Sequence, residues 1–192
     1  MTPGIGHNSG RSDALGKSWR RFAWSKARKQ LLPTLPVEVV RLRVRRAKEL
    51  GLPYKTYAGI RASTGHDLIG FLFSNNALMV LREGQGMPLD RVKKLEQLRL
   101  TARIAVTHPP VSPDYVVRLS AIDRAAAAPS FSASWSEMRD LIKEIATADG
   151  HPADRYVLIG ETAFEREWAE AGQMAGYLAA AQYFDGSAQN GL

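Results

Sequence analysis

The chain contains no cysteine and only four histidines among its 192 residues. The absence of cysteine excludes disulfides, thiol nucleophiles, iron–sulfur clusters and zinc-finger sites. No two histidines have the spacing of metal ligands, and neither an HExxH motif nor an acidic cluster occurs. We therefore expect no metal site.

Long apolar runs and phosphate-binding loops are missing as well. No apolar run approaches the roughly 18 residues of a membrane span, and the N-terminus lacks the apolar core of a secretion signal. Gly84 and Gly86 have neither a third glycine nor a following Lys-Ser or Lys-Thr, so no nucleotide cofactor is expected. These absences predict a cytoplasmic protein without a transmembrane segment or a cofactor.

The composition that is present predicts a folded protein with an uneven charge. Apolar residues make up 45% of the chain, which excludes global disorder, and the formal net charge is +7. Residues 1–60 carry 13 basic and 3 acidic side chains, residues 61–110 carry 7 and 4, and residues 111–192 carry 6 and 12. The corresponding net charges are +10, +3 and −6, so the positive charge is concentrated at one end of the chain.

The first residues contain a short motif, Gly4-Ile5-Gly6-His7-Asn8-Ser9-Gly10. It resembles an N-terminal tag of assorted alphaproteobacterial and phage-related proteins, including relatives of a small nucleoid-associated family. The resemblance covers seven residues and implies a lineage rather than an activity. Because the segment is rich in glycine and polar residues, we expect residues 1–14 to form a flexible leader.

Two helices are predicted to form a basic arm over residues 15–50. The first runs from Leu15 to Leu31, and the two prolines of the segment 32–36 stop it. The second begins at Pro36 and ends near Leu50, because Gly51 suits a left-handed C-terminal cap. Its apolar face is predicted to be Val37, Val40, Val44 and Ala47, and Arg41, Arg45 and Lys48 form a neighbouring stripe.

Residues 51–185 are predicted to form a mixed body, and residues 186–192 a frayed tail. Helical periodicity predicts helices over 53–62, 88–99, 113–128 and 161–184, and a further helix after the capping-box residues Ser134 and Glu137. A helical turn or more is expected over 75–82. Short strands are expected over 66–73, 101–107 and 155–159. The predicted fold class is mainly α with a small β component, either α/β or α+β, with about six to eight helices and three short strands.

The basic arm is the first candidate functional surface. Its predicted contact residues are Arg20, Arg21, Lys26, Arg28, Arg41, Arg43, Arg45 and Arg46. Such a surface can neutralise the phosphates of DNA or RNA and release their counterions. The same charge can instead dock on an acidic protein partner or on the acidic last third of this chain, and a basic helix with aromatic residues also suits an anionic membrane surface.

Residues 54–76 have the outline of a helix–turn–helix motif, with Ser63-Thr64-Gly65 as the turn. A recognition helix must present polar or basic side chains to the base edges. The second helix would present Leu68, Phe71 and Phe73 instead, which belong in a core. A buried strand is therefore the favoured interpretation.

The ends of the three predicted strands form the second candidate. Ser74-Asn75-Asn76 follows the first strand, His108 follows the second, and Gly160-Glu161-Thr162 follows the third. If these strands are parallel neighbours, the three groups meet at one edge of the sheet, where α/β enzymes hold their ligands. The alternative is that Ser, Asn and Thr at helix starts only satisfy free backbone amides.

The sequence thus predicts, first, a non-enzymatic binding protein that engages nucleic acid or an acidic partner through its basic helices. The first alternative is a small α/β enzyme with a site near Ser74, Asn76, His108 and Glu161. The second alternative is a regulatory or scaffold subunit. The oligomeric state stays open.

Overall fold

The computed structural model describes residues 35–119 and 121–186. The chain divides into two compact units at Val40 and Arg41. The four predicted contact residues Arg20, Arg21, Lys26 and Arg28, the leader and the first arm helix lie outside the described residues. The larger unit, from Arg41 onward, contains every strand described.

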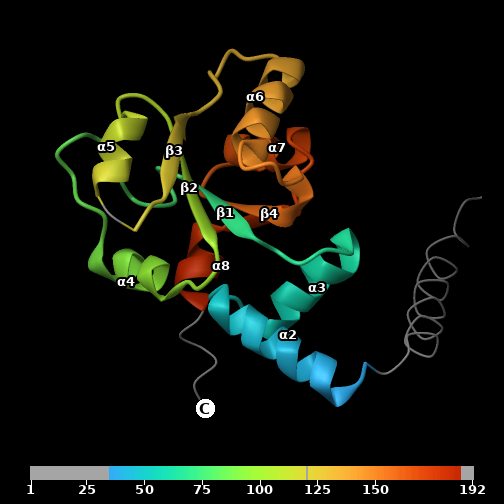
Figure 1. Ribbon diagram of the computed structural model, residues 1–192. Coiled ribbons are helices and arrows are strands. Elements are labelled where there is room, and N and C mark those ends of the chain that lie inside the picture. Colours follow the sequence, from blue (N-terminus) through green and yellow to red (C-terminus); the bar gives the residue numbers. More distant parts are fainter. Residues whose placement is uncertain (1–34, 120, 187–192) are drawn as a thin grey trace, which may run out of the picture. The chain divides into compact units, whose positions relative to one another are not determined.

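Five parallel strands form one sheet in the order β3-β2-β1-β4-β5. The strands are β1 (Gly70–Ser74), β2 (Ala102–Thr107), β3 (Arg124–Ala127), β4 (Tyr156–Gly160) and β5 (Gly176–Ala179). The central strand β1 pairs with β2 on one side and with β4 on the other (Figure 1). The chain first builds the sheet outward through β2 and β3 and then returns to add β4 and β5. This order is Rossmann-like, and the topological switch point lies between β1 and β4.

Seven helices accompany the sheet in the described part of the chain. They are α2 (Val37–Glu49), α3 (Tyr54–Thr64), α4 (Leu89–Gln97), α5 (Pro113–Arg118), α6 (Trp135–Thr147), α7 (Ala163–Ala171) and α8 (Ala180–Phe184). A single 3-10 turn, Ala153–Arg155, precedes β4. The fold is therefore α/β, one of the two classes that the sequence predicted.

Side chains of alternate strand residues fill two separate cores. Phe71 and Phe73 of β1 point to a core that includes residues of α3, α4, α5 and α8. Leu72, between them, points to the other core, which α6 and α7 cover (Figure 1). Because helices cover both faces, the central strands β1 and β4 are buried along their whole length. This explains why these two strands appear in the sequence as unbroken apolar runs.

Several predicted elements are confirmed. The helix expected to end at Gly51 ends at Glu49, with Gly51 at a positive φ of 63° and Ala47 buried. The helix expected over 88–99 is α4, and the capping box of Ser134 and Glu137 starts α6. The three predicted strands correspond to β1, β2 and β4. The segment 75–82 forms a turn after β1 and no helix.

Two predicted helices are too long, and the sheet has five strands rather than three. The helix expected over 113–128 ends at Arg118, and residues 124–127 pair with β2 as edge strand β3. The helix expected over 161–184 ends at Ala171, and residues 176–179 pair with β4 as edge strand β5. Positive φ angles at Ala121 and Gln173 interrupt the two helices. Pairing with the sheet overrides the local helical preference of these alanine-rich segments.

Candidate functional site

The carboxyl ends of β1, β2 and β4 bring the predicted strand-end residues to one edge of the sheet. Ser74 ends β1, His108 follows β2, and Glu161 follows β4. Since β1 lies between β2 and β4 and all three are parallel, the three strands are the parallel neighbours that this prediction required. This edge also includes the topological switch point, the usual ligand position in open parallel sheets.

Ser74 and Asn75 are buried at this edge and serve the backbone around them. Ser74 Oγ accepts a hydrogen bond from the backbone N–H of Ala77 at 3.0 Å. The Asn75 amide donates to the carbonyl of Val80 at 3.0 Å and accepts from the backbone N–H of His108 at 2.9 Å. Asn75 therefore joins the loop after β1 to the loop after β2. Ser74 thus satisfies a backbone amide, as the capping interpretation expected, but the amide belongs to a turn and not to a helix start.

Glu165 is the buried carboxylate of this edge, and the sequence patterns considered above did not single it out. Its Oε2 accepts hydrogen bonds from the backbone N–H groups of Glu161 at 2.6 Å and Thr162 at 3.0 Å. Its Oε1 accepts from the Asn76 amide at 2.8 Å, which links α7 to the loop after β1 across the switch point. The sequence does contain a pattern that identifies Glu165, because Thr162 and Glu165 have capping-box spacing.

Gly160 makes this arrangement sterically feasible. A Cβ atom at Gly160 would lie 2.7 Å from Cε2 of Tyr177 and 3.0 Å from Oε2 of Glu165. Both distances are shorter than normal contacts, so a larger residue would displace the carboxylate or the ring. The last residue of β4 is thus restricted by the buried Glu165.

His108 lies in a cluster of aromatic rings. Its imidazole stacks on Phe131 with a centroid distance of 4.7 Å and an interplanar angle of 5°, and it lies 5.0 Å from the ring of Trp168. Phe131 is 76% exposed, so one face of the stack borders solvent. Burial lowers the pKa of His108, and the nearby Glu165 carboxylate opposes this shift in part. His108 is therefore held mostly as the neutral imidazole at neutral pH.

The chemical groups at this edge are thus mainly engaged inside the protein. The Ser74 hydroxyl, the Asn76 amide and the Glu165 carboxylate each hold a loop or a helix start. The residues of this edge that border solvent are Glu161, Thr162 and Phe131, and the buried His108 lies beneath Phe131. These hydrogen bonds hold the loops around the switch point in place, and Phe131 and Glu161 form an aromatic and acidic rim beside it.

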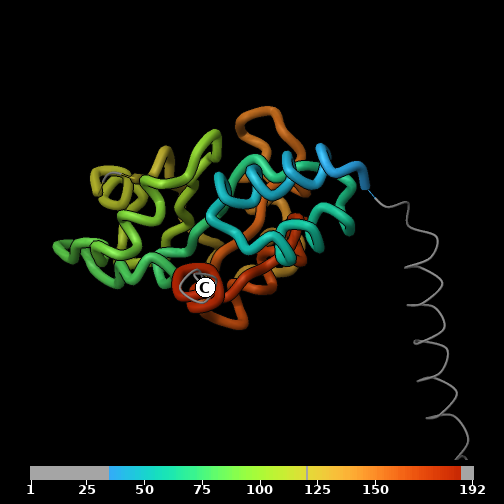
Figure 2. The backbone as a smooth tube through the Cα atoms, turned by 90° about the horizontal axis from the view of Figure 1, so that it is seen from below, coloured from blue at the N-terminus to red at the C-terminus, as the bar shows by residue number. Residues whose placement is uncertain are grey.

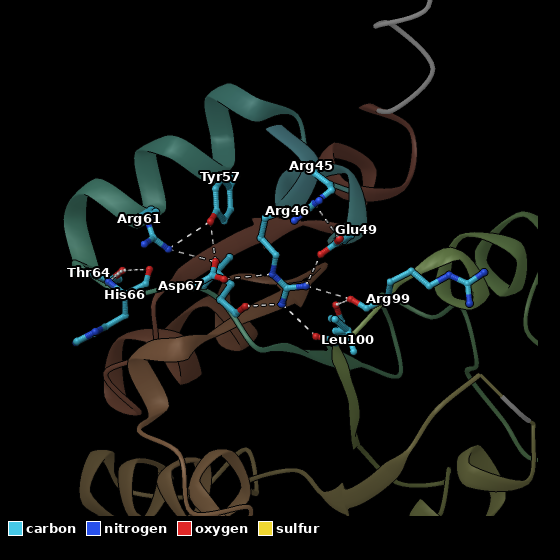
Figure 3. A network of polar contacts seen from close by, with 12 residues as sticks. Arg45, Arg46, Glu49, Tyr57, Arg61, Thr64, His66, Asp67, Arg99 and Leu100 are labelled. Atoms are coloured by element: carbon cyan, nitrogen blue, oxygen red, sulfur yellow. Dashed lines mark hydrogen bonds and ion pairs between the residues drawn. The ribbon is translucent and has the colours of Figure 1, made fainter. Parts of the chain in front are cut away.

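The other predicted surface lies on α2, where Arg46 points into the protein (Figure 3). Its guanidinium forms ion pairs with Glu49 at 3.1 Å and Asp67 at 3.3 Å. It also donates to the carbonyls of Leu68, Arg99 and Leu100 at 2.8, 3.1 and 3.0 Å. The partners at 67–68 and 99–100 precede β1 and β2. Arg46 therefore clamps α2 to the amino edge of the sheet and does not present its guanidinium to a partner.

Asp67 connects this network to α3. It accepts a hydrogen bond from the Tyr57 hydroxyl at 2.7 Å and pairs with Arg61 at 3.5 Å (Figure 3). Burial raises the pKa of Tyr57, and the hydrogen bond to the Asp67 carboxylate raises it further. The hydroxyl thus stays protonated and remains a donor.

The remaining predicted arginines of α2 differ in exposure. Arg41 is exposed, and the Arg45 side chain is 72% exposed, with one long ion pair to Glu49 at 3.9 Å. Arg43 is half-buried, and its Nε is buried without a hydrogen-bond partner among the described residues. Arg41, Arg45 and the exposed Lys48 follow one another at helical spacing, as the sequence predicted. They form the basic stripe of α2.

Comparisons with family models, with curated proteins and with solved structures give no significant match for this chain. In the described ranges, no helix has the length and apolarity needed to cross a membrane. Within the same ranges, no cluster of three or more histidine or acidic side chains is arranged to hold a metal ion. The function must therefore be inferred from the geometry alone.

Proposed function

We propose that the protein is a non-enzymatic binding protein that engages a nucleic acid through the basic stripe of α2. The observation that carries the proposal is the outward position of Arg41, Arg45 and Lys48 on one rigid helix. Arg46, on the adjacent side, anchors that helix to the segments before β1 and β2 through four contacts. A fixed helix with an exposed cationic stripe suits phosphate binding, because little backbone freedom is lost when the partner binds.

The chemistry of the stripe agrees with a phosphate backbone. Arginine presents planar pairs of donors that match phosphate oxygens, and lysine adds a point charge. Each phosphate that is neutralised releases counterions, so affinity falls steeply with salt. The ion pairs of Arg45 and Arg46 use Glu49 and Asp67, which belong to the first half of the chain. This favours an external partner over docking on the acidic last third.

A salt series with the full chain tests the proposal. We expect binding of single- or double-stranded oligonucleotides at about 50 mM salt, with log Kd rising linearly with log salt. The double variant Arg41→Gln/Arg45→Gln should lower the slope by roughly 1 to 2 and weaken binding to all sequences by a similar factor. The matched control is Arg139→Gln, because Arg139 is a partly exposed arginine on α6 that pairs only with the neighbouring Asp140 among the described residues.

Three outcomes would contradict the proposal. They are no binding at about 50 mM salt, a flat salt dependence, and an equal loss in the Arg139→Gln control. Binding of a polyglutamate peptide in preference to both kinds of oligonucleotide would indicate an acidic protein partner instead.

A second candidate function uses the carboxyl edge of the sheet. It is favoured by one observation, the stacked His108 and Phe131 beside the switch point, where a planar small molecule can pack on the exposed Phe131 ring that His108 supports. A thermal-shift screen of small metabolites would test this alternative. A compound that stabilises the wild type and has no effect on His108→Ala would support it, and a screen without such a compound would remove it.

A further inference from the structure

A cavity of about 380 Å³ lies at the end of α2, away from the carboxyl edge of the sheet. Its walls come from three places in the chain: the end of α2 with the segment 51–53, helix α4 with Leu98, and Phe184 of α8. Helix α8 lies next to α4 in both overall views (Figure 1, Figure 2). The cavity is within the usual size range of small-molecule sites, near its lower end.

The lining combines apolar and cationic side chains. The apolar part consists of Leu52, Pro53, Leu98 and Phe184, and the charged part consists of three lysines and one aspartate. Lys48 and Lys93 are exposed, and Lys94 is half-buried. The aspartate, Asp90, lies one helical turn before Lys93 and Lys94 on α4. The cavity therefore offers a ligand an apolar floor and a net positive rim.

We propose that this cavity binds a small amphiphilic carboxylate, with its apolar body on Leu52, Leu98 and Phe184 and its carboxylate beside Lys48 and Lys93. Because a water molecule occupies about 30 Å³ of liquid, the volume suits a body of roughly ten non-hydrogen atoms. Burial of that body supplies affinity, and the lysines supply the preference for an anion. This site shares Lys48 with the basic stripe of α2, but its ligand is a small molecule and its test needs no nucleic acid.

The environment of Lys94 shows how apolar this cavity is. Its ammonium donates to the carbonyl of Tyr183 and lies 4.4 Å from the centroid of the Tyr183 ring. Burial lowers the pKa of Lys94 to about 8, and the nearby Asp185 opposes the shift. Charges in such surroundings are weakly screened, so an anion entering the cavity interacts with Lys94 more strongly than it would at an open surface, and the exposed Lys48 and Lys93 add a smaller, more screened attraction.

The aspartate in the wall favours a singly charged headgroup. Asp90 lines the same cavity and offsets part of the charge of the lysines. The cost of removing an anion from water grows with the square of its charge, whereas its attraction to the lysines grows only linearly, so apolar surroundings favour a monoanion over a dianion. A phosphate monoester carries close to two negative charges at neutral pH, whereas a carboxylate carries one. We therefore expect a carboxylate to bind more tightly than a phosphate monoester with the same alkyl chain.

Calorimetric titration of the full chain with octanoate tests the proposal. The comparison ligands are octanol, octyl phosphate and butyrate, which change the charge, the headgroup and the apolar length one at a time. We expect octanoate to bind at least fivefold more tightly than each of them. Preferential binding of octanol or octyl phosphate, or equal binding of butyrate, would contradict the assigned chemistry, and no octanoate binding up to 10 mM (about the weak limit of a specific small-ligand site) would overturn the site itself.

Matched variants locate the binding. Gln97 is an exposed lining residue, so Gln97→Trp should fill the cavity and lower octanoate affinity at least tenfold. Its control is Glu96→Trp, at the exposed neighbouring position outside the lining, which should leave octanoate affinity unchanged. Lys48→Gln/Lys93→Gln should weaken octanoate binding by roughly tenfold and leave octanol unaffected. Lys55→Gln, an exposed lysine outside the cavity, is the charge control. Equal effects in a variant and its control would overturn the assignment.

Discussion

Replacement of Arg46 by methionine should destabilise the fold more than any other arginine substitution in α2. The variant keeps an unbranched apolar stem of similar length to that of arginine and removes the guanidinium. Two carboxylates then lose their nearest cation, so that Glu49 keeps only the long pair with Arg45 and Asp67 keeps Arg61 and the Tyr57 hydroxyl. Three backbone carbonyls lose a donor. The Arg46 side chain is 15% exposed, so water replaces these contacts only in part.

The contacts around Arg46 set the size of the effect. Removing one partner of a fully buried ion pair costs about 3–5 kcal/mol. The side chains of Asp67 and Glu49 are 42% and 27% exposed, so the loss of Arg46 falls at the lower end of that range. The carbonyls of Arg99 and Leu100 lie near the surface, where water can hydrate them, and this reduces the cost. We therefore expect Arg46→Met to lower the free energy of unfolding by about 3 kcal/mol, which corresponds to a fall in Tm of roughly 6–12 °C for a domain of this size. Arg46→Lys should recover about half, since one ammonium cannot reach all five acceptors.

Urea denaturation followed by circular dichroism measures this change, with the m-value checked for constancy. Arg45→Met is the matched control: the side chain is 72% exposed, its single ion pair is 3.9 Å long, and its removal should cost less than about 0.5 kcal/mol. The reasoning is refuted if Arg46→Met costs less than about 1 kcal/mol or no more than Arg45→Met.

Three further predictions concern other parts of the fold. Gly70→Ala should cost about 2 kcal/mol or more in urea denaturation, because its Cβ would lie 2.7 Å from the Ala102 carbonyl oxygen, whereas Gly59→Ala, with open space on α3, should stabilise by about 0.5–1 kcal/mol. Glu165→Ala should lower the free energy of unfolding by about 3 kcal/mol, since two backbone donors and the Asn76 amide lose their acceptor. The control Glu167→Ala, at an exposed position, should change it by less than about 0.5 kcal/mol, and equal losses in the two variants would contradict the prediction. Lys94, with its pKa lowered to about 8, binds fewer protons in the folded than in the unfolded chain between about pH 8 and 10. The free energy of unfolding should therefore rise over that interval relative to Lys94→Met, and parallel pH profiles of the two proteins would contradict the assignment.

The sequence predicts the central elements of this fold well, for a physical reason. Strands β1 and β4 are covered on both faces, so their residues form continuous apolar runs that stand out from helical periodicity. The edge strands β3 and β5 are four residues long and only partly buried. Their residues, Arg-Ala-Ala-Ala and Gly-Tyr-Leu-Ala, carry no comparable pattern. Their strand conformation comes from pairing with β2 and β4, which no local window contains.

The position of each strand-end residue can likewise be predicted from the sequence, whereas its contacts cannot. That Ser74, His108 and Glu161 share one edge follows from the order of strands and helices, and the sequence predicted it conditionally. The part played by each residue depends on partners far away in the chain. Asn76 donates to Glu165, 89 residues later, and His108 stacks on Phe131 from the loop after β3. Spacing alone does not reveal these contacts.

Helix α2 shows that the number of basic residues in a helix does not determine how many of them lie on a binding surface. Arg45 and Arg46 are neighbours in the sequence, but successive residues of a helix are rotated by about 100°, so they point in different directions. Arg45 is directed to solvent with Arg41 and Lys48, and Arg46 is directed to carbonyls that precede β1 and β2. Those carbonyls belong to loops at the amino edge of a parallel sheet, where backbone acceptors lack strand partners. A cation is the side chain that satisfies several of them at once. The positive charge of α2 therefore has two separable parts, since Arg46 stabilises the edge of the sheet and the exposed stripe beside it is the proposed surface for an anionic partner. A variant set that compares Arg45 with Arg46 distinguishes them, because the first should change binding without stability and the second should change stability first.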